Sequence, residues 1–357
     1  MSFIGTKGTH TIMETGARKK RLNSVKVSLS EVAERANVSH ATVSRVLNNV
    51  NVPIAPETRK LVRHIAAELG YSPNRAARAL ATGRTQTIAL WTTNLRSAYY
   101  GDVIHYTNQE IIRHEYEMLV SCVGVTHDMT IDTFKLLSWP VDGILAVDLP
   151  RGEIPGLKDS LLDGKPFINI GAYVVTGMDY VQIDFKDQAV EAIHHLAAIG
   201  CKRIAYVVPS FFDWFEEAKD ARLEGYRKGM SDIGQKPEYI ITPDEKRESV
   251  GVTLQAHIQQ HGCPDGLFCY NDEMAIGAYP TLRESGRRIP EDVAIVGCDG
   301  IRDTSYLYPA LTTIIQPMER MCATAWSFLE KRIQNPAISL QQEVLPSRLE
   351  IRGSSQR

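Results

Sequence analysis

The feature that most constrains this chain is the stretch 27–48, which reads VSLSEVAERANVSHATVSRVLN. It contains two short patterns of helical periodicity separated by a tight turn. Ser28, followed three residues later by Glu31, is a capping box in which the two residues satisfy each other's free backbone N–H groups. Asn37 falls at the turn, where asparagine tolerates a left-handed backbone. The pattern predicts a helical hairpin whose second helix begins after the capping residue Ser39.

This second helix has two different faces. Its apolar stripe, at spacing i, i+3, i+4 and i+7, consists of Val43, Val46, Leu47 and Val50. The opposite stripe is small, polar and free of acidic residues, and consists of His40, Ala41, Ser44, Arg45 and Asn48. In a DNA major groove, arginine pairs with guanine, asparagine pairs with adenine, and small side chains reach the thymine methyl. The alternative at this point is an ordinary helical hairpin with a solvated face.

A third helix is expected over residues 56–69. Pro56 suits a first helical turn and Gly70 suits a helix end. Three short helices make a domain with a small core. Residues 73–81 (PNRAARALA) then have good helix propensity but little apolar surface to pack, and so short a helix needs a partner to form.

The segments VSLSEVAERANVSHATVSRVLN and PETRKLVRHIAAELGYSPNRAARAL resemble the headpiece and hinge of the lactose-repressor/galactose-repressor (LacI/GalR-type) family of bacterial transcription regulators, and the resemblance extends to about Gly353. It implies that the helix after Ser39 is the recognition helix and that the hinge folds on DNA. Leu80 would then enter a minor-groove step, where an apolar wedge bends the duplex; an ordinary linker leucine is the alternative. The DNA-binding residues implied are Ser28, Leu29, Ser39, His40, Ala41, Thr42, Ser44, Arg45, Asn48, Asn74, Arg75, Ala77 and Leu80.

Two headpiece positions depart from the family pattern. Asn37 stands where glycine is usual, which the geometry of the turn permits. Ala55 replaces the usual serine cap of the third helix, so we expect that helix to start less firmly.

Charge divides the chain into a basic front and an acidic body. Residues 1–86 hold 14 Lys and Arg against 5 Asp and Glu, whereas the remainder holds 26 against 37. Such a front suits binding of a polyanion, with an affinity that falls steeply with salt. Residues 1–25 are expected to be a disordered basic leader; an arm that adds phosphate contacts through Arg18, Lys19, Lys20 and Arg21 is the alternative.

Several other classes of protein are not expected. No run nears the roughly 18 apolar residues that cross a bilayer, and the N-terminus lacks the apolar core of a signal peptide, so we expect a cytoplasmic protein. The 6 cysteines are scattered without a CxxC pair, which indicates reduced thiols. Signatures of nucleotide cofactors, metalloproteases and serine hydrolases are absent, so we expect no enzyme, cofactor or metal. His194 and His195 adjoin on a helical run and therefore diverge.

From residue 87 onward, strand and helix patterns alternate. The expected strands are 87–92, 118–124, 143–148 and 166–170, followed by a second series at 203–208, 239–242, 265–270 and 292–298. The expected helices are 100–114, 128–137, 217–233, 248–261, 272–285 and 317–334. Alternation of this kind predicts parallel sheets wrapped by helices, and two series predict two subdomains with a cleft between them.

The predicted fold class is a small all-α helix-turn-helix headpiece plus an α/β periplasmic-binding-protein-like effector domain of two parallel-sheet subdomains. The expected boundaries are 1–25 for the leader, 26–72 for the headpiece, 73–86 for the hinge helix and linker, and 87–357 for the effector-binding and dimerisation domain. Within that domain, 87–185 and 317–340 would form the N-subdomain, and 186–316 and 341–357 the C-subdomain.

Three polar residues are placed to bind a ligand, because ligands of open α/β sheets bind beyond the carboxyl ends of the strands. Asn271 and Asp299 follow two expected strands, and Arg222 lies on the helix after the first strand of the second series. An amide, a carboxylate and a guanidinium can together hold hydroxyls or the edge of a heterocycle. In the structural alternative, Asn271 or Asp272 only caps a helix and Arg222 pairs with Asp299.

The segments RLEGY, LFCYNDEMAIGA, VAIVGCDG and PALTTIIQP resemble the family's effector pocket. The resemblance carries effector binding onto Arg222, Asn271 and Asp299, and onto Tyr99 and Tyr100, whose rings can form a stacking wall. Gly171 stands where several members place a carboxylate, which puts that contact in doubt. A cluster of four aromatic residues could either stack on a sugar at the edge of the pocket or pack internally. These residues are Phe211, Phe212, Trp214 and Phe215.

Together these features predict a ligand-regulated, sequence-specific DNA-binding transcription regulator, and a repressor in particular. The expected partners are near-palindromic double-stranded operator DNA, a sugar or related small metabolite, and a second copy of the chain, because two-fold protein symmetry matches two-fold DNA. Tetramer-forming family members carry a leucine-rich tail that this sequence lacks, so a homodimer is expected. The rival class is a solute-binding sugar receptor, which would have a signal peptide and no headpiece.

Overall fold

The computed structural model describes residues 27–48, 52–71, 79–80, 82–123, 139–149, 164–173, 177–210 and 220–357. The chain divides into two compact units, Met1–Thr82 and Gly83–Arg357, each of which is considered separately. The expected leader, the helix at 128–137 and the aromatic group at 211–215 lie outside the described residues.

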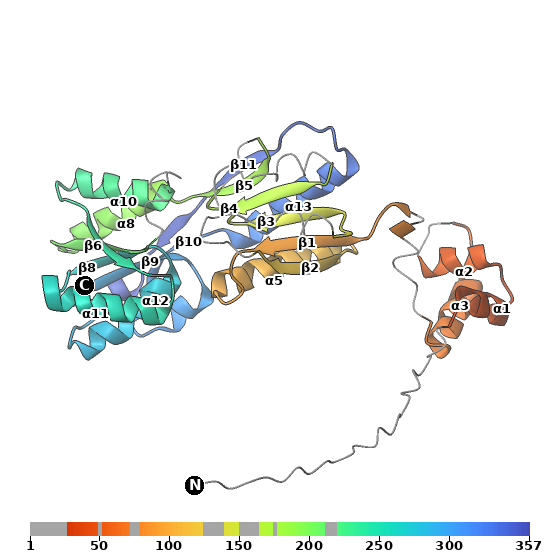
Figure 1. Cartoon of the computed structure of the whole chain (residues 1–357), viewed down its shortest axis with the longest axis horizontal. Helices are drawn as coiled ribbons and strands as arrows, with labels where there is room; N and C mark the ends of the chain where they lie inside the picture. The colour runs from red at the N-terminus through yellow and green to blue at the C-terminus, as the bar shows by residue number, and fades with distance from the viewer. Residues whose placement is uncertain are drawn as a thin grey trace, which may run out of the picture. The chain divides into compact units, whose positions relative to one another are not determined.

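The described part of the first unit contains α1 (Leu29–Ala36), α2 (His40–Leu47) and α3 (Pro56–Glu68), drawn in red and orange in Figure 1. The predicted capping box is present, since the Glu31 N–H donates to Ser28 Oγ at 3.3 Å and the Ser28 N–H donates to Glu31 Oε2 at 2.5 Å. Asn37 ends α1 in the left-handed conformation, with φ 50°. Ser39 caps α2 by accepting the Thr42 N–H at 3.1 Å. These features confirm the local predictions for the hairpin.

The core of this three-helix unit, called the headpiece below, is small. Its fully buried side chains are Val32, Val43, Val46 and Val62, surrounded by buried alanines and Ile65. Burying a valine contributes roughly 1.5–3 kcal/mol, so a few contacts hold the headpiece together. Helix α3 starts at Pro56 without a side-chain cap, as expected from Ala55.

The second unit contains two six-stranded sheets. The first has the order β11-β5-β4-β3-β1-β2, with all strands parallel. Its strands are β1 (Thr87–Thr92), β2 (Glu117–Cys122), β3 (Gly143–Val147), β4 (Phe167–Gly171), β5 (Asp179–Asp184) and β11 (Gln342–Pro346). Helices α5 (Ala98–Arg113) and α13 (Met318–Gln334) pack against each other and against this sheet.

The second sheet has the order β12-β10-β9-β8-β6-β7. Its strands are β6 (Ile204–Pro209), β7 (Glu238–Thr242), β8 (Gly266–Cys269), β9 (Ala294–Asp299), β10 (Thr312–Ile315) and the antiparallel β12 (Arg348–Glu350). Figure 1 shows α8 (Lys186–Ala198) and α10 (Ala221–Asp232) on one face, with α11 (Arg247–His261) and α12 (Asp272–Glu284) on the other. Covered on both faces, the central strands are continuously apolar.

The predicted fold class is confirmed, with two corrections to the boundaries. Residues 341–357 do not all belong to the C-subdomain, because β11 pairs with β5 in the first sheet. Residues 83–86 belong to the second unit, where Asp142 accepts the N–H groups of Thr85 at 2.7 Å and Gln86 at 2.9 Å. The chain crosses between the sheets after β5, after β10 and after β11. No helix among the described residues is long and apolar enough to cross a membrane.

Candidate functional site

Helix α2 turns the predicted polar stripe outward. Val43 and Val46 are buried in the headpiece core, whereas His40, Ala41 and Arg45 are exposed. Ser44 and Asn48 are partly exposed and share a hydrogen bond of 3.2 Å from the Asn48 amide to Ser44 Oγ. The apolar and polar faces therefore lie as the periodicity predicted for residues 40–48, whereas Val50 lies outside the described residues.

The other predicted DNA-binding residues have different settings. Ser28 and Ser39 are exposed and serve as helix caps, and the Ser39 and Thr42 hydroxyls lie 2.9 Å apart. Leu29 packs partly against the headpiece core. Leu80 exposes 89% of its surface within the described residues. Asn74, Arg75 and Ala77 lie outside the described residues.

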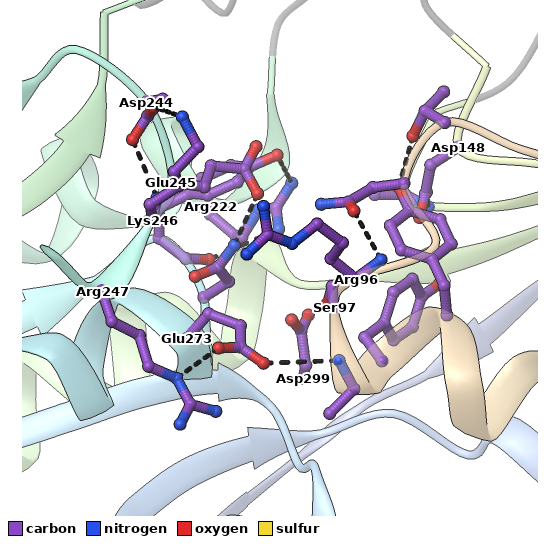
Figure 2. Close-up of a pocket in the computed structure, with 18 of the residues that line it drawn as sticks. Arg96, Ser97, Asp148, Arg222, Asp244, Glu245, Lys246, Arg247, Glu273 and Asp299 are labelled. Atoms are coloured by element: carbon purple, nitrogen blue, oxygen red, sulfur yellow. Dashed lines mark hydrogen bonds and ion pairs between the residues drawn. The ribbon is translucent and has the colours of Figure 1, made fainter. Parts of the chain in front are cut away.

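The second unit contains a cavity of about 1090 Å³ between its two sheets, shown in Figure 2. Its lining residues follow the carboxyl ends of strands from both sheets, including β1, β3 and β4 of the first and β7, β8 and β9 of the second. The sequence predicted this location from the placement of polar residues after strands. All five predicted effector-binding residues line the cavity: Tyr99, Tyr100, Arg222, Asn271 and Asp299.

Arg222 is only 4% exposed and pairs with Asp220 rather than with Asp299. Its Nη2 lies 3.0 Å from Asp220 Oδ2 and donates to the hydroxyls of Tyr173 and Tyr270, each at 2.9 Å. Burial alone would raise the pKa of Asp220, but the neighbouring guanidinium holds that pKa below its usual range. Tyr173 follows β4 and Tyr270 follows β8, so this network joins the two sheets across the cavity.

The start of α10 positions Arg222. Asp220 caps this helix by accepting the N–H groups of Arg222 at 2.9 Å and Leu223 at 3.0 Å. Gly225, one turn further on, lets α10 approach α8 closely, since a Cβ there would lie 2.4 Å from the Lys186 carbonyl oxygen. The same carboxylate therefore starts the helix and neutralises the arginine.

Asn271 both caps a helix and faces the cavity. Its Oδ1 accepts the Met274 N–H at 2.9 Å at the start of α12, while its Nδ2 donates to Glu245 Oε2 at 2.8 Å. Burial raises the pKa of Glu245 to about 7. The structural role considered from the sequence is thus present, and the amide remains available on the cavity side.

Asp299 ends β9 with φ 124° and accepts a hydrogen bond of 2.9 Å from Gln316 Nε2. Burial, together with the nearby carboxylate of Asp272, raises its pKa well above the ordinary value. Asp272 has a structural task, because it accepts the N–H groups of Gly300 at 2.7 Å and Ile301 at 2.9 Å. It ties down the loop that presents Asp299.

Tyr99 and Tyr100 stand at the start of α5 with their ring centroids 5.0 Å apart in an edge-to-face arrangement. The Tyr100 hydroxyl lies 2.8 Å from Thr93 Oγ1. Burial raises the pKa of both phenols well above the ordinary value, so both hydroxyls remain neutral donors. The expected stacking wall therefore also carries polar groups.

Sequence reasoning missed Asp148, Glu245, Tyr173, Tyr270 and Gln316, all of which line the cavity. Asp148 directly follows β3, as Asp299 ends β9, so the same rule about strand ends could have found it. Its Oδ1 accepts the Ala172 N–H at 2.7 Å, and burial raises its pKa. The predicted divergence of the adjacent histidines is present: His194 pairs with Asp232 at 3.3 Å, and His195 contacts Ser355.

A helical headpiece with an outward polar recognition face, joined in one chain to a two-sheet unit with a polar cavity, defines a DNA-binding regulator that responds to a small ligand. Residues 28–74 match the model of bacterial regulatory proteins of the lacI family, and residues 193–355 match a periplasmic binding protein-like domain. The chain belongs to the lacI family of bacterial regulatory proteins.

Two relatives show the extent of the similarity. Catabolite control protein A of Staphylococcus epidermidis (strain ATCC 12228 / FDA PCI 1200) is 30% identical over 340 residues, which cover 92% of this chain and 99% of the relative. The HTH-type transcriptional repressor PurR of Proteus mirabilis (strain HI4320) is 32% identical over 337 residues, with coverage of 91% and 96%. The second of these relatives is, by its name, a transcriptional repressor.

Solved structures show the same architecture. The lac repressor dimer bound to operator and the anti-inducer ONPF matches with a TM-score of 0.79 at 25% identity, covering 93% of this chain and 99% of that one. The complex of the transcriptional regulator CelR with cellobiose matches with a TM-score of 0.64 at 27% identity, covering 92% and 99%. The family resemblance read from the sequence is confirmed, and the chain is a ligand-regulated DNA-binding transcription regulator of the repressor type.

Proposed function

We propose that this regulator is a homodimer that binds near-palindromic operator DNA through α2 and responds to a sugar or related metabolite in the cavity. The observation that carries the proposal is that one chain has both an exposed polar stripe without acids on α2 and a polar cavity that joins two sheets. Either feature alone, the polar stripe or the cavity, would also fit proteins with other functions. Acting on bacterial DNA places the protein in the cytoplasm.

The α2 stripe has the chemistry of a base-reading surface. Arg45 is exposed and offers a planar fork of donors that suits guanine, while Ala41 is small enough to approach a thymine methyl. The stripe lies opposite the buried Val43 and Val46, so the headpiece core holds it in place. In a dimer, two such helices would read the two halves of a near-palindromic operator.

The cavity has the chemistry of a sugar site. Its walls combine phenol rings with a carboxylate at Asp299, an amide at Asn271 and the guanidinium of Arg222. Rings cover the apolar faces of a sugar, and groups of these kinds bind its hydroxyls. Support comes from the CelR–cellobiose complex and from a lacI-family regulator of Enterococcus faecium with bound ribose, 25% identical with a TM-score of 0.65.

The network around Arg222 connects the two subdomains and so can couple ligand binding to operator affinity. Tyr173 from the first sheet contacts both Asp220 at 2.7 Å and Tyr270 at 2.9 Å on the second, and Ala98 donates to Glu273 across the cavity at 3.3 Å. A ligand held by both sheets would favour one relative position of the two subdomains, and regulation requires only that operator affinity differ between positions.

The test combines operator binding with ligand binding. Intact protein is expected to shift promoter DNA in a gel, whereas the fragment 83–357 is not, because it lacks α2. A sugar that raises the melting temperature of the intact protein should also change its operator affinity. Equal DNA binding by both forms would contradict the assignment of α2, and a stabilising sugar that leaves operator affinity unchanged would contradict the regulatory role of the cavity.

A further inference from the structure

Gly171 and Asp148 compete for the same space at the cavity. Strands β3 and β4 are parallel neighbours with Val147 opposite Ile170, so Asp148 and Gly171 come next to each other at their ends. A Cβ on Gly171 would lie 2.2 Å from Asp148 Oδ1, and Gly171 has φ +115°, which side chains rarely adopt. The carboxylate of Asp148 therefore occupies the place that a side chain at position 171 would need.

Asp148 keeps acceptor capacity in this position. Its Oδ1 accepts the Ala172 N–H at 2.7 Å, which fixes the carboxylate at the end of β4. An ionised carboxylate has about four lone-pair sites, so several remain for a ligand. Figure 2 shows Asp148 on the side of the cavity opposite Glu245 and Lys246.

Carboxyl groups outnumber basic side chains in the cavity lining. Asp148, Glu245 and Asp299 all line it, and Gln316, which is 5% exposed, has a buried Oε1 without a hydrogen-bond partner among the described residues. An acceptor buried in this way costs free energy until a donor reaches it. The lining therefore suits a ligand that donates hydrogen bonds.

Most positive charge in the lining is already paired. Arg222 pairs with Asp220 at 3.0 Å, Arg247 with Glu273 at 2.5 Å, and Lys246 with Asp244. Arg96 is exposed and extends into the cavity in Figure 2, so an anionic ligand would depend chiefly on this side chain. Such a ligand would also place its charge near Asp148, Glu245 and Asp299, whose pKa values burial already raises, so its charge would further oppose their ionisation.

We propose that Asp148 is an effector-binding residue that supplies the carboxylate absent at Gly171, and that the cavity selects an uncharged, hydroxyl-rich sugar over its phosphorylated form. This inference rests on the proposed function of the cavity. A sugar hydroxyl donates to Asp148 from the β3 side while groups on the second sheet hold the rest of the ring.

The experiment is calorimetric titration of the intact protein with glucose, ribose and cellobiose, and with glucose 6-phosphate and ribose 5-phosphate. At least one neutral sugar is expected to bind, and each phosphate at least tenfold more weakly than its parent sugar. Asp148→Asn keeps an acceptor for the Ala172 N–H but loses the charge, and should weaken binding of the neutral sugar tenfold or more. The matched control is Asp187→Asn, the same charge change on the exposed start of α8, which should leave binding unchanged.

Three results would overturn the inference: no binding of any neutral sugar, a phosphate bound as tightly as its parent, or equal affinities for Asp148→Asn and Asp187→Asn. The proposed function fails separately. If glucose 6-phosphate binds and releases DNA, the cavity is regulatory but its selectivity is not the one inferred. If a neutral sugar binds through Asp148 without changing operator affinity, the inference stands and the regulatory role fails.

Discussion

The polar residues of the α2 face and those of the cavity differ in solvent exposure and in how many side-chain partners they have. His40, Ala41 and Arg45 are exposed, whereas Arg222 is 4% and Asp299 7% exposed and each is bound to another side chain. A residue on the α2 face can therefore change without loss of folding free energy. Truncation of a paired cavity residue such as Arg222 costs folding free energy, because its partners would be left buried without it.

This difference separates specificity from stability in the same chain. Substitutions on the α2 face should alter operator affinity alone, whereas substitutions in the cavity should alter ligand binding and unfolding together. The following substitutions test the contrast.

The largest effect is expected from Arg222→Ala. It leaves the Asp220 carboxylate buried without its cation and removes a donor from the hydroxyls of Tyr173 and Tyr270. Breaking a buried pair by removing one partner costs roughly 3–5 kcal/mol. Urea unfolding of the intact protein should show this loss, and calorimetry should show loss of ligand binding.

The control for Arg222→Ala is Arg288→Ala, which breaks an ion pair of 2.8 Å with Asp292 whose arginine side chain is 71% exposed. Exposed pairs contribute little to stability because water screens them, so this variant should unfold nearly as the parent does. Similar losses in the two variants would mean that burial of the Arg222 network does not stabilise the second unit.

Arg45→Ala should have an intermediate effect, confined to DNA. Loss of a fork of donors to a base costs roughly 1–3 kcal/mol of operator affinity, and the exposed side chain makes no comparable contribution to folding. Fluorescence anisotropy with promoter DNA measures the affinity, and the melting temperature should stay the same.

Arg35→Ala provides a matched change of charge on the headpiece. Arg35 lies at the end of α1, is exposed, and contacts Glu68 at 3.6 Å. It should weaken binding to all DNA sequences to a similar small extent, because it contributes only to long-range attraction. If Arg45→Ala behaves in the same way on promoter and unrelated DNA, α2 does not read bases through Arg45.

The contrast in setting also explains what sequence reasoning could reach. The two stripes of α2 follow from helical periodicity alone, so its buried and exposed faces were predictable residue by residue. Strands β1, β3, β4, β6, β8 and β9 are short, largely apolar runs, and that pattern predicted them. Four strands were not predicted. Strand β5 alternates between buried and half-buried residues, β10 has only four residues and begins with two threonines, and β11 and β12 are short edge strands with exposed positions, so a continuous apolar run was lacking.

In the cavity, the rule about strand ends predicted the region but not the pairing. The sequence offered Asp299 as a partner for Arg222, whereas the structure pairs it with Asp220, and this pairing depends on how α10 starts and how closely it approaches α8. The role of Asp148 depends on the register of β3 with β4 and on the empty side-chain position of Gly171. Neither the pairing of Arg222 nor the proximity of Asp148 to Gly171 can be read from the sequence, because both depend on which segments lie side by side in the folded chain.

A smaller effect, dependent on pH, is expected for Glu245→Gln. Burial raises the pKa of Glu245 from 4.5 to about 7. Between these pH values the carboxyl group is therefore protonated in the folded protein and ionised in the unfolded chain. The free energy of unfolding therefore falls as pH rises from about 4.5 to 7, and above pH 7 the full destabilisation by the buried, ionised carboxylate remains. Glutamine still accepts from Asn271 but carries no charge, so the variant should be more stable than the parent at pH 8 and not at pH 4.

Each pKa unit corresponds to about 1.4 kcal/mol, and because Glu245 is partly exposed we expect an advantage of about 1–2 kcal/mol at pH 8. Urea unfolding at both pH values measures it. Glu284→Gln, at the exposed end of α12, controls for the loss of one negative charge. An advantage for Glu245→Gln that is the same at pH 4 and pH 8 would show that titration of the cavity carboxyl is not its cause.

The smallest effect is expected from Ala55→Ser in the headpiece. Ala55 precedes α3 without a side-chain cap, and Pro56 already occupies the first helical position. A serine hydroxyl can accept one of the free N–H groups of the first turn, and such a cap contributes roughly 0.5–2 kcal/mol. Native-state hydrogen exchange in the intact protein should show slower exchange in α3 and none of the changes in β8 or β9 that a cavity substitution produces.

Ser39→Ala supplies the opposite change, because it removes the cap that accepts the Thr42 N–H at 3.1 Å. Hydrogen exchange in α2 should become faster, corresponding to a loss of opening free energy similar in size to the gain expected from Ala55→Ser. The fully buried core of the headpiece consists of a few valines, so changes of this size are a large fraction of what holds it together. If neither cap changes headpiece exchange, local capping does not limit its stability, and the stability of the α2 face must come from contacts other than those within the three helices.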